Sequence, residues 1–140
     1  DILNLKVLRP LDEGGCGRIC EGDIKVKDLI DRCKKAFNLP YIRVSGDEEK
    51  YLEKIAVCTG GGSSFVEVVI NEKVDAYITG DLSYNKARDL YFNNITHIEI
   101  DHYESEIIVK DVLYNILERE FKDKLEIKKS DANFNIYKLY

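Results

Sequence analysis

Ala76-Tyr77-Ile78-Thr79-Gly80-Asp81 is a short apolar run that ends in a glycine and an acid, which is typical of a buried strand that runs into a loop. An amphipathic segment from about Tyr84 to Phe92 follows and predicts a helix, and a second apolar run near Thr96 to Ile100 predicts another strand. The order strand, helix, strand is the repeat from which parallel sheets are built.

The same alternation extends in both directions from this stretch. Lys54 to Cys58 predicts a buried strand, ended by the glycines of Thr59 to Gly62, and Ser64-Phe65-Val66-Glu67 predicts a capping box at the start of a helix. A last long helix is predicted from about Tyr103 to Phe121. Three consecutive βα units with right-handed crossovers indicate an α/β fold, a three-layer-like lobe around a mostly parallel, mixed sheet.

The flanking regions complete the expected domain. Val26 to Phe37 predicts an amphipathic helix and Tyr41 to Ser45 a short strand, with two more short strands expected at Leu125 to Lys129 and Asn135 to Leu139. Residues 1–25 are the least regular, so we expect 1–25 to be a connector from a missing N-terminal lobe and 26–140 to be a C-terminal α/β lobe. The absence of methionine fits a segment of a longer protein.

Composition excludes several classes of protein. The apolar fraction of 44% and charged fraction of 34% are those of a soluble globular domain. The net charge of −5 and scattered basic residues argue against nucleic acid as a partner. The sequence has neither an apolar run of the roughly 20 residues that cross a bilayer nor a signal-peptide start, so we expect a cytoplasmic protein without a membrane partner. The four cysteines are expected to be reduced and mostly buried.

Ligands of open α/β sheets bind beyond the carboxyl ends of the strands. Three segments fall there, namely Thr59 to Ser64, Thr79 to Tyr84, and Asp101 to Glu106. The ligand-binding or catalytic residues are therefore expected in these loops.

His102-Tyr103-Glu104-Ser105-Glu106 is the most informative of them. If Asp101 caps the helix, His102 and Glu106 stand at i and i+4 and share one face, which suits zinc, iron or manganese. If Ser105 is the cap instead, His102 lies in the loop before the helix and the pair can still converge. An ordinary ion pair at a helix start has the same spacing, and two ligands are too few for a complete metal site.

The other loops leave alternatives open. Gly60 to Ser64 would either cradle an anion with its backbone amides or form a tight turn between strand and helix. Asp81 would cap the next helix, contact a substrate or hold a metal-bound histidine. His97 is expected to be structural. No serine lies in a nucleophile elbow, which argues against a serine hydrolase.

Together these segments resemble the Nif-three-like family, whose bacterial members are often labelled GTP cyclohydrolase I type 2 homologues. Four motifs match in order over about residues 9 to 125. They are Gly17-Arg18-Ile19, the stretch Ala56 to Ser64, the stretch Asp75 to Tyr84, and His102-Tyr103-Glu104-Ser105-Glu106.

The resemblance implies a two-lobed protein with a dinuclear metal site between its lobes, two divalent ions per complete site. It implies that His102 and Glu106 are metal ligands, that the first lobe supplies a histidine pair and an aspartate absent here, and that the full-length protein is a homo-oligomer, commonly a hexameric ring. The expected activity is hydrolysis of an anionic or nucleotide-like small molecule. The candidate residues of the substrate cleft are Gly60, Gly61, Gly62, Ser63, Ser64, Thr79, Asp81, Tyr84 and Tyr103.

Three positions depart from the family pattern. Asn85 replaces a histidine, Asp101 replaces the glycine before the last motif, and Cys20 replaces a glycine of the first. A non-enzymatic metal-binding scaffold and a flavodoxin-like nucleotide binder remain as alternatives to the hydrolase.

Overall fold

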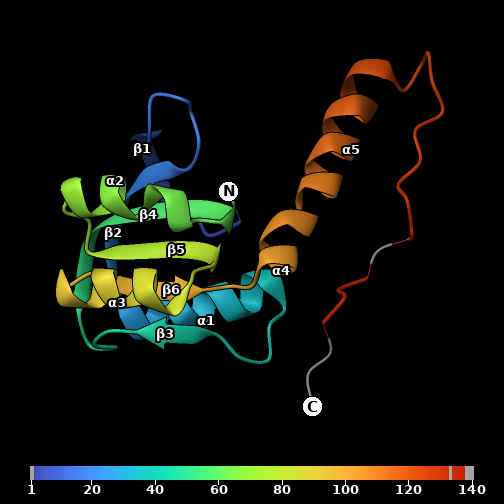
Figure 1. Cartoon of the computed structure of the whole chain (residues 1–140). Coiled ribbons are helices and arrows are strands. Elements are labelled where there is room, and N and C mark those ends of the chain that lie inside the picture. The colour runs from blue at the N-terminus through green and yellow to red at the C-terminus, as the bar shows by residue number, and fades with distance from the viewer. Residues whose placement is uncertain (1, 133, 138–140) are drawn as a thin grey trace.

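The computed structural model describes residues 2–132 and 134–137 (Figure 1). Within them, the strands form one six-stranded sheet in the order β1-β2-β4-β5-β6-β3. The elements, in chain order, are β1 (Lys6–Pro10), β2 (Arg18–Lys25), α1 (Val26–Phe37), β3 (Arg43–Ser45), β4 (Tyr51–Gly61), a 3₁₀ turn (Ser63–Phe65), α2 (Val66–Asn71), β5 (Ala76–Asp81), α3 (Tyr84–Phe92), β6 (Thr96–Glu99), α4 (His102–Ile107) and α5 (Val109–Phe121).

The centre of the sheet is parallel and its flanks are antiparallel. β4 pairs with β5 and β5 with β6 in parallel, whereas β1–β2, β2–β4 and β3–β6 are antiparallel pairs. The predicted α/β lobe with a mixed sheet is confirmed, but the sheet is not mostly parallel, because β1 and β2 add two antiparallel pairs to that of β3 with β6. Because β4, β5 and β6 run in one direction, their carboxyl ends meet at one edge, where Cys58 aligns with Thr79 and Thr79 with Glu99.

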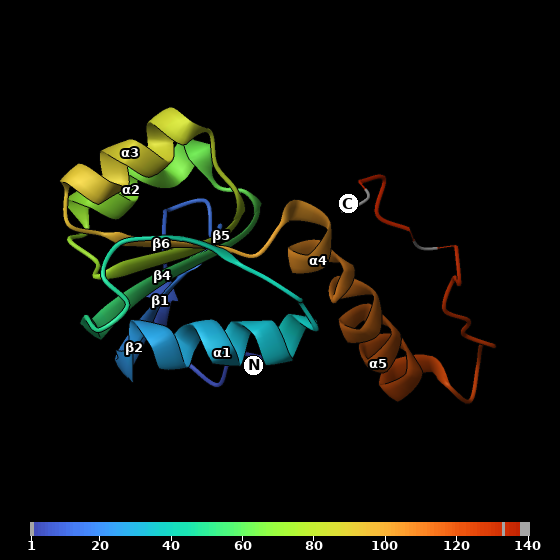
Figure 2. The same ribbon diagram turned by 90° about the horizontal axis from the view of Figure 1, so that it is seen from below.

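Helices cover both faces of the sheet, as Figure 2 shows, with α1 on one side and α2 and α3 on the other. Alternate residues of each central strand enter different cores because successive side chains of a strand point to opposite faces. Ile78 packs into the core beneath α1, and its neighbour Tyr77 packs into the core beneath α2 and α3.

Residues 1–25 were expected to be the least regular part of the chain and a connector from a missing lobe. The described residues 2–25 instead include β1 and β2, with Leu5, Ile19 and Ile24 buried, so they belong to the sheet. Neither strand could be recognised from its sequence pattern, and the reasons are physical. Every residue of the edge strand β1 is exposed, so it has no alternating pattern, and a bulge between Glu21 and Ile24 breaks the alternation of β2.

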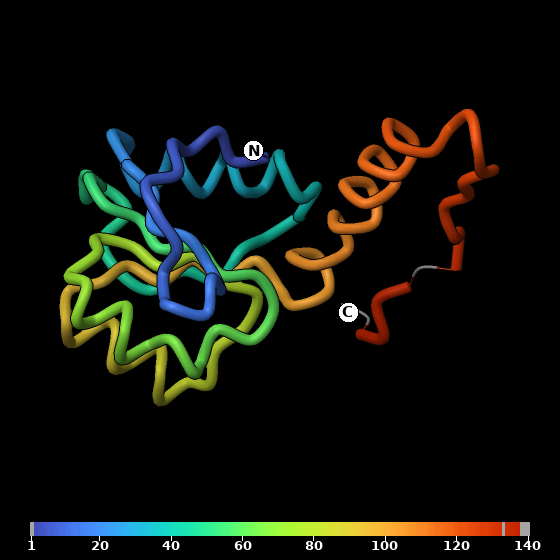
Figure 3. Tube along the Cα trace, turned by 90° about the horizontal axis from the view of Figure 1, so that it is seen from above, coloured from blue at the N-terminus to red at the C-terminus, as the bar shows by residue number. Residues whose placement is uncertain are grey.

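The carboxyl-terminal part also differs from expectation. The single long helix is divided at Ile108 into α4 and α5, and residues 125–129 form no strand. The strand expected at 135–139 lies partly outside the described residues, and 135–137 is not a strand. Figures 1 and 3 show α5 projecting from the body and the following chain turning back toward α4, away from any sheet edge that would supply hydrogen bonds.

Helix α5 is amphipathic, yet its apolar side chains face solvent. None of its residues is buried within the described chain, and Val112 and Ile116 are 52% and 43% exposed. An apolar stripe of this kind is normally covered in a folded protein.

Candidate metal half-site

The segments expected to carry chemistry meet at the carboxyl edge of the parallel strands. β5 ends at Asp81, and α4 begins at His102, directly after the loop that leaves β6. The end of β4 completes the group through Gly60 and Gly61.

His102 is held between two carboxylates. Its Nδ1 lies 2.7 Å from Asp81 Oδ2, and its Nε2 lies 3.5 Å from Glu106 Oε2. A carboxylate accepts hydrogen bonds but does not donate them, so the neutral imidazole carries its proton on Nδ1 and donates it to Asp81. The Nε2 lone pair then faces Glu106, which is the arrangement of a metal ligand oriented by a carboxylate behind it.

The same contacts control the charge of His102. Its hydrogen bond with Asp81, joined by the negative charge of Glu106, raises the pKa of His102 above its ordinary value. The side chains of His102, Asp81 and Glu106 are each about half exposed, at 50%, 50% and 54%. Solvent therefore screens this effect, and the direction of the shift extends upward the pH range in which a proton competes with a metal for Nε2.

The described residues offer two ligands, His102 and Glu106, to one metal ion. Within residues 2–132 and 134–137, no three histidine, cysteine, aspartate or glutamate side chains come together as a metal-binding group. Asp81 occupies the opposite nitrogen of His102, so it orients the ring. The donor set fits half of a site for zinc, iron or manganese.

The glycine-rich loop allows the close approach of the two ligands. Gly60 has φ +65°, and a Cβ there would overlap Glu106 Oε1 and lie 3.3 Å from His102 Nε2. A Cβ on Gly61 would lie 3.6 Å from Asp81 Oδ1. The loop therefore brings β4 against α4 at the point where a side chain would displace the ligands.

Two amides of the loop donate hydrogen bonds within the fold and are not available to an anion. The Gly60 N–H donates to Ser105 Oγ (2.8 Å) and the Gly62 N–H donates to the Asp81 carbonyl (3.3 Å). The capping box expected at Ser64 is also wrong, because α2 begins at Val66 after the 3₁₀ turn and has no side-chain cap. Of the two interpretations of this loop, the structure favours the tight turn.

Ser105 has a role in the site other than the nucleophile or helix cap for which the sequence made it a candidate. It is 1% exposed, and its hydroxyl accepts from Gly60 N and donates to the His102 carbonyl at 2.8 Å. It thus ties the first turn of α4 to the end of β4. Its place in the matched motif His102-Tyr103-Glu104-Ser105-Glu106 was the signal that could have pointed to it.

Asp101 does not cap α4 with its side chain. Its backbone has φ +88° and ψ 145°, a region that glycine adopts without strain, and its N–H donates to the Gly80 carbonyl at 2.8 Å. The glycine that the family pattern has at this position therefore has a conformational reason. Asp81 does not cap α3 either, because Ser83 accepts from the Lys86 N–H.

The remaining predicted cleft residues divide into three groups. Tyr103 joins Asp81, His102 and Glu106 in lining a cavity of about 380 Å³. Thr79 and Gly62 are buried in the fold, where the Thr79 hydroxyl donates to the Gly60 carbonyl (3.3 Å) and the Gly62 carbonyl accepts from Tyr77 (3.1 Å). Outside that cavity lie Ser63 and Ser64 in the 3₁₀ turn and Tyr84, exposed at the start of α3. Asn85, which departs from the family pattern, is exposed next to Tyr84.

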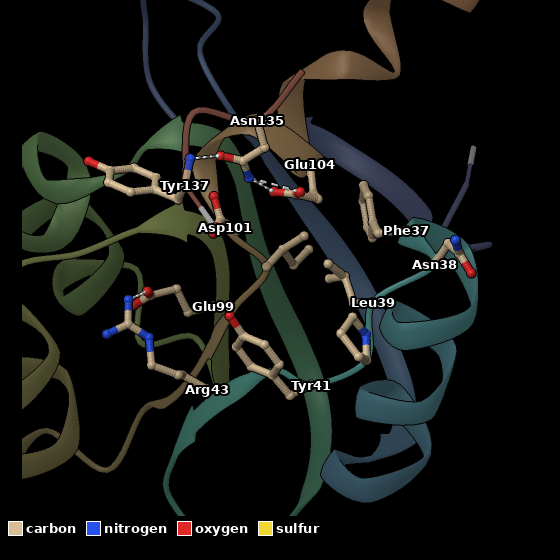
Figure 4. Close-up of a pocket in the computed structure, with 12 residues that line it drawn as sticks. Phe37, Asn38, Leu39, Tyr41, Arg43, Glu99, Asp101, Glu104, Asn135 and Tyr137 are labelled. Atoms are coloured by element: carbon tan, nitrogen blue, oxygen red, sulfur yellow. Dashed lines mark hydrogen bonds and ion pairs between the residues drawn. The ribbon is translucent and has the colours of Figure 1, made fainter. Parts of the chain in front are cut away.

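The chain after α5 returns to this cavity. Phe134, Asn135, Ile136 and Tyr137 complete its lining. A neighbouring cavity of about 630 Å³ lies on the other side of Asp101, between the end of α1 and the same segment. Figure 4 shows Asn135 there, donating through Nδ2 to both carboxylate oxygens of Glu104 at 3.0 and 3.2 Å.

Two further expectations concern residues away from the half-site. Cys20, Cys33 and Cys58 are buried, Cys16 is exposed, and all four are free thiols, which confirms the prediction for the cysteines. Among the described residues, no helix is long and apolar enough to span a bilayer.

Comparison with known proteins identifies one family and several relatives. Residues 1–135 match the sequence model of a family described as Duf34/NIF3 (NGG1p interacting factor 3). A relative named GTP cyclohydrolase 1 type 2 homolog, from Clostridium acetobutylicum, is 36% identical over 100 residues, which cover 70% of this chain and 37% of the relative. A protein of the same name from Streptococcus pneumoniae is 30% identical over 133 residues, covering 88% of this chain and 49% of the relative.

Solved structures share the fold. Hypothetical protein SA1388 of Staphylococcus aureus superposes with a TM-score of 0.77 at 24% identity, over 89% of this chain and 37% of that one. Reduced HcgD of Methanocaldococcus jannaschii gives 0.73 at 23% identity, over 86% and 49% of the two chains. This chain therefore spans about a third to a half of the length of the relatives that it matches.

Proposed function

This chain belongs to the Duf34/NIF3 family, and we propose that it contributes His102 and Glu106 to a divalent-metal centre of a hydrolase. The observation that carries the proposal is the contact of His102 Nδ1 with Asp81, which leaves Nε2 directed toward Glu106. A histidine in a plain ion pair at a helix start does not need a second carboxylate behind its ring. An imidazole that binds a metal commonly has one.

His102 and Glu106 would hold the ion, and a bound divalent ion would lower the pKa of a water molecule and polarise the substrate. Other side chains of the site orient and support these two ligands. Asp81 keeps the proton on Nδ1 of His102, and Ser105 fixes the helix turn that carries the ligands. Tyr103 lines the adjoining cavity, where it would contact the substrate.

The substrate class follows from the same proposal. Relatives of this chain carry the name GTP cyclohydrolase 1 type 2 homolog, which supports an anionic, nucleotide-like small molecule. The complete site would hold two ions, with the remaining ligands supplied by protein outside these residues. The expected homo-oligomeric ring and cytoplasmic location stay predictions.

Manganese binding followed by electron paramagnetic resonance tests the proposal. We expect this chain to bind Mn²⁺ weakly at one site, and Glu106→Gln to weaken that binding at least tenfold because one of two ligands is lost. Glu67→Gln is the matched control, since Glu67 is an exposed glutamate on the distant helix α2. Equal binding by both variants would contradict the assignment. GTP turnover by the chain alone would contradict the half-site, because the other ligands are absent.

A scaffold function is the second candidate, and the exposed apolar face of α5 favours it. On that account, substitution of His102 in the full-length protein changes its oligomeric state or stability, and no turnover is lost. Sedimentation of the His102→Ala protein alongside its turnover assay separates the two functions.

A further inference from the structure

A third hollow lies on the α2–α3 side of the sheet, between α3 and the edge strand β3. It has a volume of about 490 Å³ and none of its lining residues belongs to the proposed half-site. β3 contributes Arg43 and Ser45, β6 contributes His97 and Glu99, and α3 contributes the opposite wall. A volume of this size is that of a small-molecule site.

The floor of this groove contains buried polar atoms without partners. Ser45 and His97 stand opposite each other in the β3–β6 register, and His97 is 3% exposed. Within the described chain, Ser45 Oγ and His97 Nε2 have no hydrogen-bond partner. Groups buried in this way are normally satisfied, so a pair of them beneath a hollow indicates a missing contact.

His97 is uncharged at neutral pH. Burial, assisted by the positive charge of Arg43, lowers the pKa of His97 to about 4. One ring nitrogen is therefore a donor and the other an acceptor, and Nε2 can exchange one hydrogen bond with a neutral polar group.

The groove contains one positive charge without an acidic partner among the described residues. Glu99 is 8% exposed and is paired with Arg43, whose side chain is 74% exposed. Arg88 also lines the groove, and it has no ion pair within residues 2–132 and 134–137. The groove therefore favours an anion, and a guanidinium can bind a phosphate or a carboxylate through two hydrogen bonds.

Aromatic side chains of α3 form the wall of the groove opposite β3. Tyr84, Tyr91 and Phe92 are 80%, 58% and 77% exposed, which is high for large apolar groups. The rings of Tyr91 and Phe92 meet edge to face at 5.8 Å. Exposed rings next to a guanidinium offer a surface on which a planar ligand can stack.

We propose that this groove is a binding site for an aromatic anion of about mononucleotide size, separate from the metal half-site. The anionic group binds Arg88, the planar ring lies against the tyrosines, and a polar edge of the ring meets Ser45 Oγ and His97 Nε2. Both atoms are closed to solvent, so this last contact requires the side chains around them to move apart. A hollow floored by buried polar atoms favours a small ligand over a protein partner, which would cover a flatter surface.

The two histidines of the chain make the test direct, because nuclear magnetic resonance of the ¹⁵N-labelled imidazoles gives one set of signals for each. The metal-free chain is titrated with adenosine 5′-monophosphate, and separately with adenosine and with inorganic phosphate. We expect a saturable shift of the His97 signals, unchanged His102 signals, and at least tenfold weaker binding of adenosine and of phosphate alone. His102→Ala assigns the signals without affecting the groove.

Arg88→Ala is expected to weaken binding of the nucleotide about tenfold, the loss typical of one charged hydrogen-bonding partner. Lys86→Ala is the matched control, because it removes the same charge from the same helix but its side chain faces Glu67. Four results would overturn the proposal. They are no saturable shift, a shift confined to His102, equal affinity for phosphate alone, and His97 signals that respond to protein concentration and not to the nucleotide, as for a surface covered by a second copy.

Discussion

Asp81 Oδ2 lies 2.7 Å from His102 Nδ1, so a residue at the end of one strand sets the orientation of a ring at the start of a helix 21 positions later. Of the three roles that the sequence left open for Asp81, this contact favours the support of a histidine, and that histidine is His102. If it orients a metal ligand, Asp81→Asn should lower the affinity of the chain for zinc about 10- to 100-fold, the range observed for such supporting carboxylates. Zinc titration measures this, with Asp89→Asn on α3 as the control. Unchanged affinity would mean that Asp81 does not support His102.

Gly60 should be intolerant of even one methyl group. Gly60→Ala places a Cβ against Glu106 and His102 at φ +65°, so we expect lower stability, by about 1–3 kcal/mol, and loss of metal binding. Urea unfolding and zinc titration measure the two effects. Gly15→Ala is the control for backbone strain alone, because Gly15 has φ +78° and nothing within 4 Å of the added Cβ. If both variants lost equal stability and kept the metal, crowding of the ligands would be refuted.

Asp101 is strained, and its replacement by glycine should stabilise the chain. At φ +88° a non-glycine residue costs about 1–3 kcal/mol, and the greater freedom of glycine in the unfolded chain offsets part of the gain. The expected net increase in the free energy of unfolding is about 1 kcal/mol. Asn94→Gly is a suitable comparison, because asparagine tolerates its φ of +59°. A stability unchanged or lowered by Asp101→Gly would show that the aspartate side chain contributes more than its backbone costs.

Stability should fall in mild acid because of His97. Its folded pKa of about 4 lies below the ordinary value of 6.5, so the unfolded state binds the extra proton between these values. The contribution of neutral His97 to the free energy of unfolding is fully present above pH 6.5. Its loss between pH 7 and pH 5 should be on the order of 2 kcal/mol. Urea unfolding at both pH values measures it, and His97→Gln should flatten the difference. A wild-type curve as flat as that of the variant would contradict the buried neutral state.

The parallel core of the fold could be predicted because its residues follow simple periodicities. Val26–Phe37 and Tyr84–Phe92 form helices with the expected bounds, and the three central strands lie where the apolar runs place them. β1 and β2 could not be predicted in this way. The pairing partner of an edge strand decides its structure, and a bulge removes the alternation that would have revealed β2.

The half-site shows the same division. Spacing places His102 and Glu106 on one face of a helix, but the Asp81 contact and the Ser105 hydroxyl depend on where the loops after β5 and β4 meet α4. Periodicity carries no information on such long-range contacts. The glycine loop illustrates the consequence, because its amides could be assigned only after the bonds of Gly60 and Gly62 were known.

Calorimetric titration of zinc and manganese into this chain and its His102→Ala variant tests the central claim most directly. The account predicts a weak one-site isotherm for the wild-type chain and loss of most of it in the variant, because one of two ligands is gone. Identical isotherms for the two proteins would contradict the account and leave His102 with a structural role.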